Sequence, residues 1–140
     1  MYSRILVATD GSAHANRASE HALNLARQFP GAHVTLFHVT PSLSRGHLIK
    51  SQFDIKSMLE DEAHQHITRT ECNFREAGIP FQVEVALGDP AAEIIHKAET
   101  EAFDLLILGS RGLNKFKEFV LGSVSNQVAH EVKCPVLIVK

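Results

Sequence analysis

Short, continuous apolar runs recur along the chain, and each is separated from the next by residues with helical spacing. The runs at 5–8, 105–108 and 136–139 contain no polar residue. Runs of this kind suit parallel strands that are covered on both faces of a sheet. Two further strands are predicted over His33–Val39 and Phe81–Ala86. The second of these alternates between apolar and polar residues, which places it nearer an edge of the sheet.

Helices are predicted between the strands from their periodicity and from residues that start or stop a helix. Ser12 and Asp89 are suited to be N-caps, and Pro90 follows Asp89 at the first helical position. Gly78 is placed to end a long amphipathic helix. The predicted helices cover 13–29, with Pro30 and Gly31 as the stop, then 51–77, a segment from Pro90, and 123–132.

The order of elements is therefore βαβαβαβαβ, which implies one α/β domain over residues 1–140. Alternation of this kind builds an open parallel sheet of five strands with helices on both faces. A chain of 140 residues is long enough for a single hydrophobic core. The periodicity does not give the order of the strands in the sheet.

Composition excludes several kinds of partner. The formal net charge is −2 without a long run of one sign, which argues against binding to nucleic acid or to an anionic membrane. No apolar run approaches the roughly 20 residues of a membrane span, and we expect no signal peptide before the first strand. Cys72 and Cys134 fit no metal or redox spacing, so a reducing cytoplasm is the simplest location.

A glycine pattern carries the functional information. It reads Gly109-Ser110-Arg111-Gly112, then nine residues, then Gly122-Ser123, and it lies between a buried strand and a helix. Phosphate-binding loops occupy this position, because free backbone N–H groups and the helix dipole attract anions. The alternative is that these glycines only make turns. The chain has neither a P-loop nor a dinucleotide-binding G-x-G-x-x-G, and a lone Asp10 replaces the two adjacent acids expected of a receiver domain.

Histidine and lysine side chains offer few further candidates for ligands or catalysts. The nine histidines lack the spacing of a helical zinc site, as the pairs His64/His66 and His14/His21 illustrate, and we expect solvated surface histidines. Lys115 and Lys117 could contact phosphate or form a solvated loop face. No nucleophile with an adjacent base can be named from the sequence.

These segments resemble the universal stress protein family, of its ATP-binding type, over the whole length of the chain. The similarity lies in the glycine pattern and in the stretches 5–12, 88–90, 104–112, 121–125 and 134–139. The resemblance implies a Rossmann-like fold related to the adenine nucleotide alpha hydrolases, with strand order 3-2-1-4-5. The carboxyl ends of strands 1 and 4 would then be neighbours at the switch point where open α/β sheets bind ligands.

The resemblance also implies a nucleotide site. ATP is the implied cofactor, with Mg²⁺ reached by Asp10 through water. Val39 would meet the adenine edge with its backbone, and Arg111 either contacts the ligand or is a solvated loop residue. The implied site residues are Ala8, Thr9, Asp10, Val39, Gly109, Arg111, Gly112, Gly122, Ser123, Val124 and Ser125.

Three classes of function remain open. The first is a nucleotide-dependent regulatory protein of the stress response, which the resemblance favours. The second is a slow ATPase or phosphotransferase, for which only Asp10 is available near the phosphates. The third is a dimeric interaction module that does not use nucleotide. The last strand, 136–140, is an apolar edge through which we expect the chain to form a homodimer, as family members do.

Overall fold

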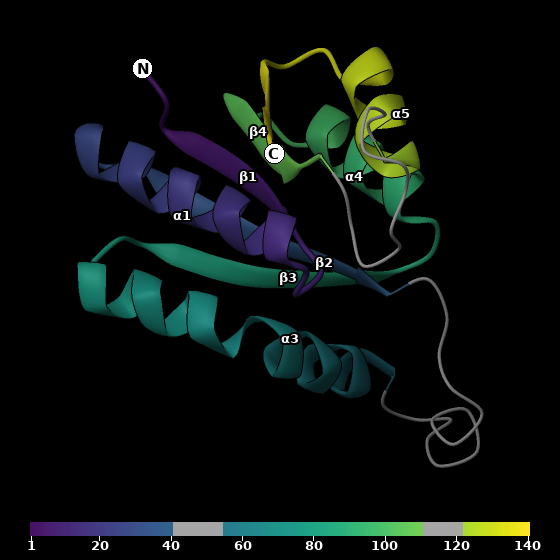
Figure 1. Cartoon of the computed structure of the whole chain (residues 1–140), viewed down its shortest axis with the longest axis horizontal. Coiled ribbons are helices and arrows are strands. Elements are labelled where there is room, and N and C mark those ends of the chain that lie inside the picture. Colours follow the sequence, from purple (N-terminus) through teal and green to yellow (C-terminus); the bar gives the residue numbers. More distant parts are fainter. Residues whose placement is uncertain (41–54, 111–121) are drawn as a thin grey trace.

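The computed structural model describes residues 1–40, 55–110 and 122–140, apart from the side chains at 55, 56 and 62. Strands and helices alternate along the chain (Figure 1). The elements are β1 (Arg4–Thr9), α1 (Ala13–Gln28), β2 (His33–Thr40), α3 (Ile55–Ala77), β3 (Phe81–Leu87), α4 (Pro90–Thr100), β4 (Leu105–Gly109), α5 (Ser123–Glu131) and β5 (Val136–Val139). The predicted start of the second helix, 51–54, lies outside the described residues.

The five strands form one parallel sheet in the order β3-β2-β1-β4-β5, which confirms the predicted fold. In the centre of the sheet, Leu6 of β1 is in register with Thr35 of β2 on one side and Leu106 of β4 on the other. The alternating strand, β3, lies at one edge as predicted, and β5 lies at the other.

Helices cover both faces of the sheet, each over its own apolar layer. On one face, α1 and α3 pack on Ile5, Val7 and Leu36. On the other face, α4 and α5 pack on Leu6, Phe37 and Leu106. Consecutive residues of the central strands thus point to opposite layers, and both layers are apolar, which is why these strands appear as unbroken apolar runs.

The predicted helix caps are present. The Ser12 hydroxyl accepts a hydrogen bond from the Ala15 amide (3.1 Å), and the Asp89 carboxylate accepts one from the Ala92 amide (2.9 Å). Gly78 follows α3 with φ of +70°, a left-handed conformation that glycine adopts without steric cost. The buried face of α1 differs in detail from the prediction, because Ser19 and Leu23 are buried whereas Leu25 and Phe29 are half-buried.

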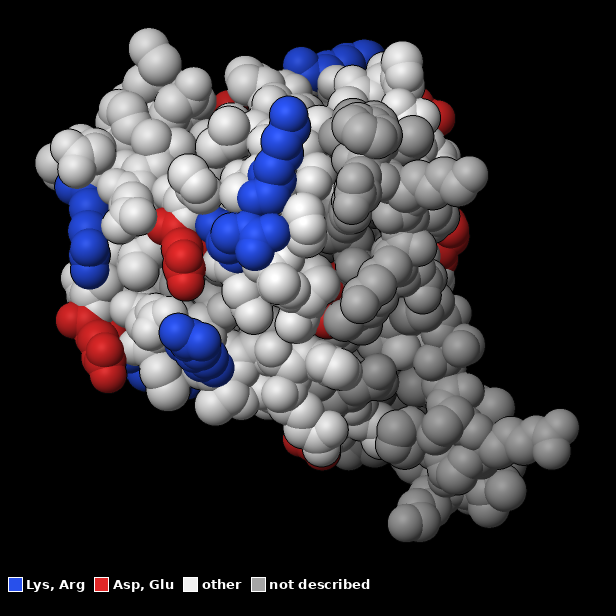
Figure 2. Space-filling model, viewed as in Figure 1, with Lys and Arg blue, Asp and Glu red and all other residues white. Residues whose placement is uncertain are grey.

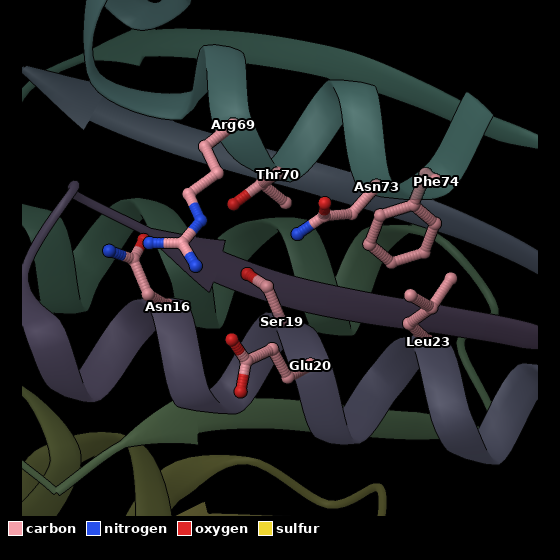
Figure 3. Close-up of a pocket in the computed structure, with 8 residues that line it drawn as sticks. All are labelled: Asn16, Ser19, Glu20, Leu23, Arg69, Thr70, Asn73 and Phe74. Atoms are coloured by element: carbon pink, nitrogen blue, oxygen red, sulfur yellow. The ribbon is translucent and has the colours of Figure 1, made fainter. Parts of the chain in front are cut away.

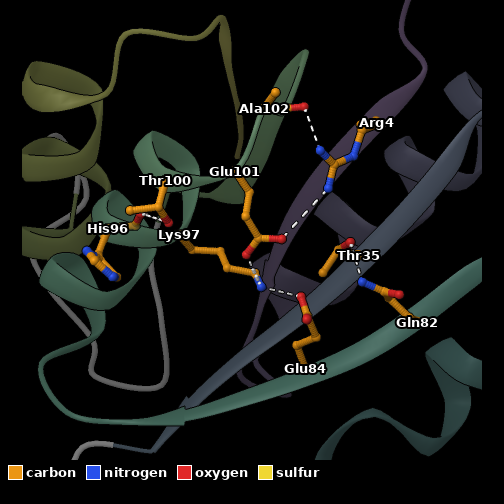
Figure 4. Close-up of polar contacts among 9 residues, drawn as sticks. All are labelled: Arg4, Thr35, Gln82, Glu84, His96, Lys97, Thr100, Glu101 and Ala102. Atoms are coloured by element: carbon orange, nitrogen blue, oxygen red, sulfur yellow. Dashed lines mark hydrogen bonds and ion pairs between the residues drawn. The ribbon is translucent and has the colours of Figure 1, made fainter.

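Charged side chains connect α4 to the start of β1 and to β3 (Figure 4). Lys97 forms ion pairs with Glu101, the C-cap residue of α4, and with Glu84 of β3, and Arg4 lies 3.7 Å from Glu101. Burial lowers the pKa of Lys97, but the hydrogen bonds to Glu101 and Glu84 and the negative charges of these carboxylates together outweigh burial and raise it. The network therefore holds a charged lysine over the sheet at neutral pH.

Candidate functional site

The carboxyl ends of β1 and β4 define the candidate site. These two strands pair in the centre of the sheet, with Val7 opposite Ile107, and the order of the sheet reverses between them. After β1 the chain enters α1 on one face, and α5 lies on the other face. A crevice outside the strand ends at such a point is where open α/β sheets bind ligands.

The turn after β1 places Asp10 at this end of the sheet. Thr9 is buried, and its hydroxyl donates a hydrogen bond to the carbonyl of Phe37 (3.3 Å). Asp10 is half-buried, and its Oδ1 accepts a hydrogen bond from the Ser12 amide (2.9 Å). Gly11 has φ of +79°, so this tight turn uses the conformational freedom of glycine. The turn thus fixes Asp10 and uses one of its two carboxylate oxygens.

Gly109, at the end of β4, contacts the first turn of α1. A Cβ at this position would lie 2.7 Å from the Cβ of His14 and 3.0 Å from the amide nitrogen of Ala15. Neither Gly109 nor Gly122 is among the described glycines with positive φ. Positive φ is therefore not the reason for glycine at these two positions. Gly109 instead allows α1 to approach β4 closely.

Ser110 joins four elements at the base of the site. Its amide donates to the carbonyl of Val139 (2.7 Å), and its carbonyl accepts from the Gly122 amide (2.7 Å) and from the Ser125 hydroxyl (2.9 Å). Its own hydroxyl lies 3.0 Å from Nδ1 of His14. The end of β4 is thereby tied to β5, to the start of α5 and to the first turn of α1.

Helix α5 begins without a side-chain cap, because its N-cap is Gly122. The corresponding positions of α1 and α4 carry Ser12 and Asp89, which cap their helices. The backbone at Gly122 has φ −56° and ψ 157°, close to the φ −69° and ψ 161° of Ser12. The geometry at the start of α5 is thus that of a capped helix from which the capping group is missing.

The remaining predicted site residues lie in different surroundings. Ser123 is exposed at the start of α5, whereas Ser125 is buried and its hydroxyl is directed to the carbonyls of Ser110 and Gly122. Val124 and Ala8 are half-buried and pack against the layer under α4 and α5.

The last three predicted site residues lie on β2 or outside the described part of the chain. Val39 follows His38, the residue opposite Thr9, so it lies one residue beyond the end of β1 on the neighbouring strand. Arg111 and Gly112 fall outside the described residues, as do Lys115 and Lys117.

The prediction of solvated surface histidines is wrong for His38 and His14. His38 is only 4% exposed, and His14 is half-buried against Ser110, so neither is a solvated surface residue. For His38 a signal was available, because it lies in a strand between Phe37 and Val39. No local pattern connects His14 to Ser110. Within the described part of the chain, no group of three or more His, Cys, Asp or Glu side chains could hold a metal ion.

Elsewhere the described residues form a small hollow and a surface of mixed charge. A hollow of about 20 Å³, room for one water molecule, lies between α1 and α3 (Figure 3) and is lined by Asn16, Ser19, Glu20, Leu23, Arg69, Thr70, Asn73 and Phe74. Basic and acidic side chains are scattered over the face shown in Figure 2 without a continuous basic area. None of the helices, where described, is long and apolar enough to span a membrane.

Comparison with known proteins identifies the family. The fold is that of the Rossmann-like α/β proteins, and residues 1–140 match the sequence model of the Universal stress protein family. The chain belongs to the universal stress protein family. It is 32% identical over 149 residues to the universal stress protein YxiE of Bacillus subtilis, with full coverage of both chains.

Solved structures agree with this assignment. The protein MJ0577, a universal stress protein of Methanocaldococcus jannaschii, is 31% identical with a TM-score of 0.84, and the match covers 100% of this chain and 96% of that one. A universal stress protein from Archaeoglobus fulgidus, solved in complex with dAMP, shares the fold at 23% identity, with a TM-score of 0.71 and coverage of 99% and 98%. Other structural neighbours were solved with AMP or cAMP.

Proposed function

We propose that this protein binds an adenine nucleotide, ATP together with Mg²⁺, and acts as a nucleotide-dependent regulatory protein of the stress response. In this proposal the ligand lies in the crevice at the ends of β1 and β4. The protein works in the cytoplasm as a homodimer.

The uncapped start of α5 is the observation that supports the proposal most directly. The first amides of a helix need acceptors from outside the helix. At α1 and α4 a side chain supplies one, whereas the glycine N-cap of α5 supplies none. A phosphate group satisfies such amides and is further favoured by the helix dipole. The amides of Ser123, Val124 and Ser125 are the donors in this proposal.

The adenine part of the proposal draws on the structural neighbours. Their ligands dAMP, AMP and cAMP share an adenine base, a sugar and a phosphate. In this chain the backbone of Val39 would meet the base, and the sugar and phosphates would lie along Ala8, Thr9, Asp10, Gly109, Arg111, Gly112, Gly122, Ser123, Val124 and Ser125. Because Oδ1 of Asp10 accepts a hydrogen bond from the Ser12 amide, its other carboxylate oxygen would accept a hydrogen bond from a water molecule bound to Mg²⁺.

A Gly122→Ser variant tests the proposal. Since the backbone angles at Gly122 resemble those at Ser12, the new hydroxyl should cap α5 from within. It would then compete with phosphate for one charge-assisted hydrogen bond, worth about 1.5–3 kcal/mol. Calorimetric titration should show ATP affinity reduced roughly 10- to 150-fold, while the melting temperature is kept or slightly raised.

Adenosine is the matched ligand control, because it lacks phosphate and its affinity should not change in this variant. A parent protein that binds neither ATP nor AMP would overturn the proposed function. A Gly122→Ser variant that binds ATP as the parent does would remove α5 from the site.

A second candidate, slow phosphoryl transfer, is favoured by one contact. Ser110 Oγ lies 3.0 Å from His14 Nδ1, which places a hydroxyl beside a base of the kind that activates nucleophiles. Intact-mass spectrometry after incubation with Mg²⁺ and ATP tests it. A phosphoryl adduct that disappears in Ser110→Ala would support this candidate, and an unmodified parent would remove it.

A further inference from the structure

The buried histidine of β2 holds the last carbonyl of β1. Nδ1 of His38 lies 2.9 Å from the carbonyl oxygen of Thr9. A carbonyl oxygen can only accept, so the proton must be on Nδ1 and His38 must donate. Thr9 and His38 form the final pair in the β1–β2 register, and both residues are buried. The side chain of His38 in β2 therefore fixes the point at which β1 leaves the sheet.

A second histidine packs on the same turn from α3. The rings of His38 and His66 are 5.5 Å apart and within 17° of parallel. His66 also touches the turn itself, because a Cβ on Gly11 would lie 3.0 Å from His66 Nδ1 and 3.3 Å from its carbonyl oxygen. Gly11 thus has both positive φ and close contact with α3. The two imidazoles enclose the turn from β2 and from α3.

The turn between these contacts carries Asp10, whose Oδ1 bonds the Ser12 amide. One end of the turn is held by His38 at Thr9, and the middle is held by His66 at Gly11. A carboxylate that is to meet a ligand must be fixed to within about 0.5 Å, and neighbouring packing and hydrogen bonds provide that precision. Neither histidine belongs to the site residues predicted from the sequence.

We propose that His38 and His66 are positioning residues that hold the Thr9–Ser12 turn, and through it Asp10, in the geometry needed for nucleotide binding. The effect on nucleotide binding rests on the proposed function, whereas the contacts of His38 and His66 with the turn are present in the protein without a ligand. It assigns to α3 a direct role in ordering the site.

Paired substitutions at His38 test the hydrogen bond itself. In His38→Asn the side-chain amide nitrogen occupies nearly the place of Nδ1 and keeps a donor for Thr9. In His38→Gln the amide lies one bond further out, near the place of Nε2. We expect His38→Gln to weaken binding of Mg²⁺–ATP about tenfold, equivalent to about 1.4 kcal/mol, and His38→Asn to restore most of the affinity. His21→Gln, on the exposed face of α1, is the matched control and should bind as the parent does.

A double-mutant cycle shows whether the effect passes through Asp10. If His38 acts by positioning Asp10, His38→Gln should cost little further affinity when Asp10 is already Asn. Hydrogen exchange of the Gly11 and Ser12 amides, measured without ligand, should be faster in His38→Gln than in His38→Asn. Additive losses in the cycle, or equal exchange in the two variants, would overturn the inference.

The exposed His66 gives an independent test if the His38 variants do not fold. His66→Phe keeps a ring against His38 and Gly11, whereas His66→Ala removes it, so only the alanine variant should lose affinity and speed amide exchange in the turn. Equal behaviour of these two variants would refute the inference. If the parent binds no ATP, the proposed function fails, and the exchange comparison alone decides whether the histidines hold the turn.

Discussion

Replacing Gly109 with alanine places a methyl group in the contact between β4 and the first turn of α1. The added Cβ would lie 2.7 Å from the Cβ of His14, 2.8 Å from its carbonyl carbon and 3.0 Å from the amide nitrogen of Ala15. Ordinary contacts begin at 3.4 Å, so the shortest contact requires a shift of about 0.7 Å. Two of these three atoms are backbone atoms of α1, so no rotation of a side chain relieves the overlap.

The cost of this overlap can be placed within a range. Overpacking in a well-packed interior typically costs about 1–3 kcal/mol. Alanine offsets about 0.4–1 kcal/mol of this cost, because it reduces the conformational entropy of the unfolded chain. The middle of each range gives a net loss of about 1.3 kcal/mol. With an unfolding entropy of about 2.1 cal/mol/K per residue, the melting temperature of this 140-residue chain should then fall by about 4 °C.

Thermal unfolding followed by circular dichroism measures this shift, with Gly122→Ser as the companion variant. The two glycines belong to one sequence pattern, yet only Gly109→Ala should lower the melting temperature. A Gly109→Ala protein that melts with the parent or above it would refute the argument that this glycine exists for the packing of α1 on β4.

Three further predictions concern pH, assembly and catalysis. Hydrogen bonds from the backbone amides of Arg4 and then Ser3 lower the pKa of Asp104, so its stabilising contribution is present above the unfolded value of about 3.9 and is lost as the pH falls through the lower folded value. When thermal unfolding is measured at decreasing pH, Asp104→Asn should therefore lose less stability than the parent. Leu137 is 39% exposed on the edge strand β5, so Leu137→Lys should shift sedimentation from dimer to monomer, whereas a monomeric parent would contradict the proposed interface. Turnover of ATP should stay far below the usual range of about 1–1000 per second, and faster turnover that is lost in Asp10→Asn would contradict the binding-protein proposal.

Strands and caps could be predicted because their causes are local. Central strands of a parallel sheet are buried on both faces, so they leave unbroken apolar runs such as 105–108. Ser12 and Asp89 act within three residues of themselves, at the Ala15 and Ala92 amides, so their identity alone indicates a helix start. The strand order has no local cause, and it came from the family resemblance.

The contacts that organise the site could not be predicted, because they join residues that are distant in sequence. Gly109 looked like a phosphate-loop glycine, and only the structure shows that His14 packs against it. Ser125 was predicted as a site residue, and its hydroxyl here bonds the carbonyl of Ser110. His38 bonds Thr9 across two strands, a pairing that depends on register.

The glycine pattern therefore combines two requirements that its spacing alone does not separate. Gly109 has no side chain so that α1 can approach β4, and this contact brings the first turn of α1 to the carboxyl end of β4. Gly122 has no side chain, so α5 begins without a side-chain cap beside the same strand end, and the Gly122 amide bonds the carbonyl of Ser110. Ser110 connects the two helix starts, because it meets His14 with its hydroxyl and Gly122 with its carbonyl. A substitution at either glycine should thus report on a different property, at Gly109 on the packing of the fold and at Gly122 on the proposed binding of phosphate.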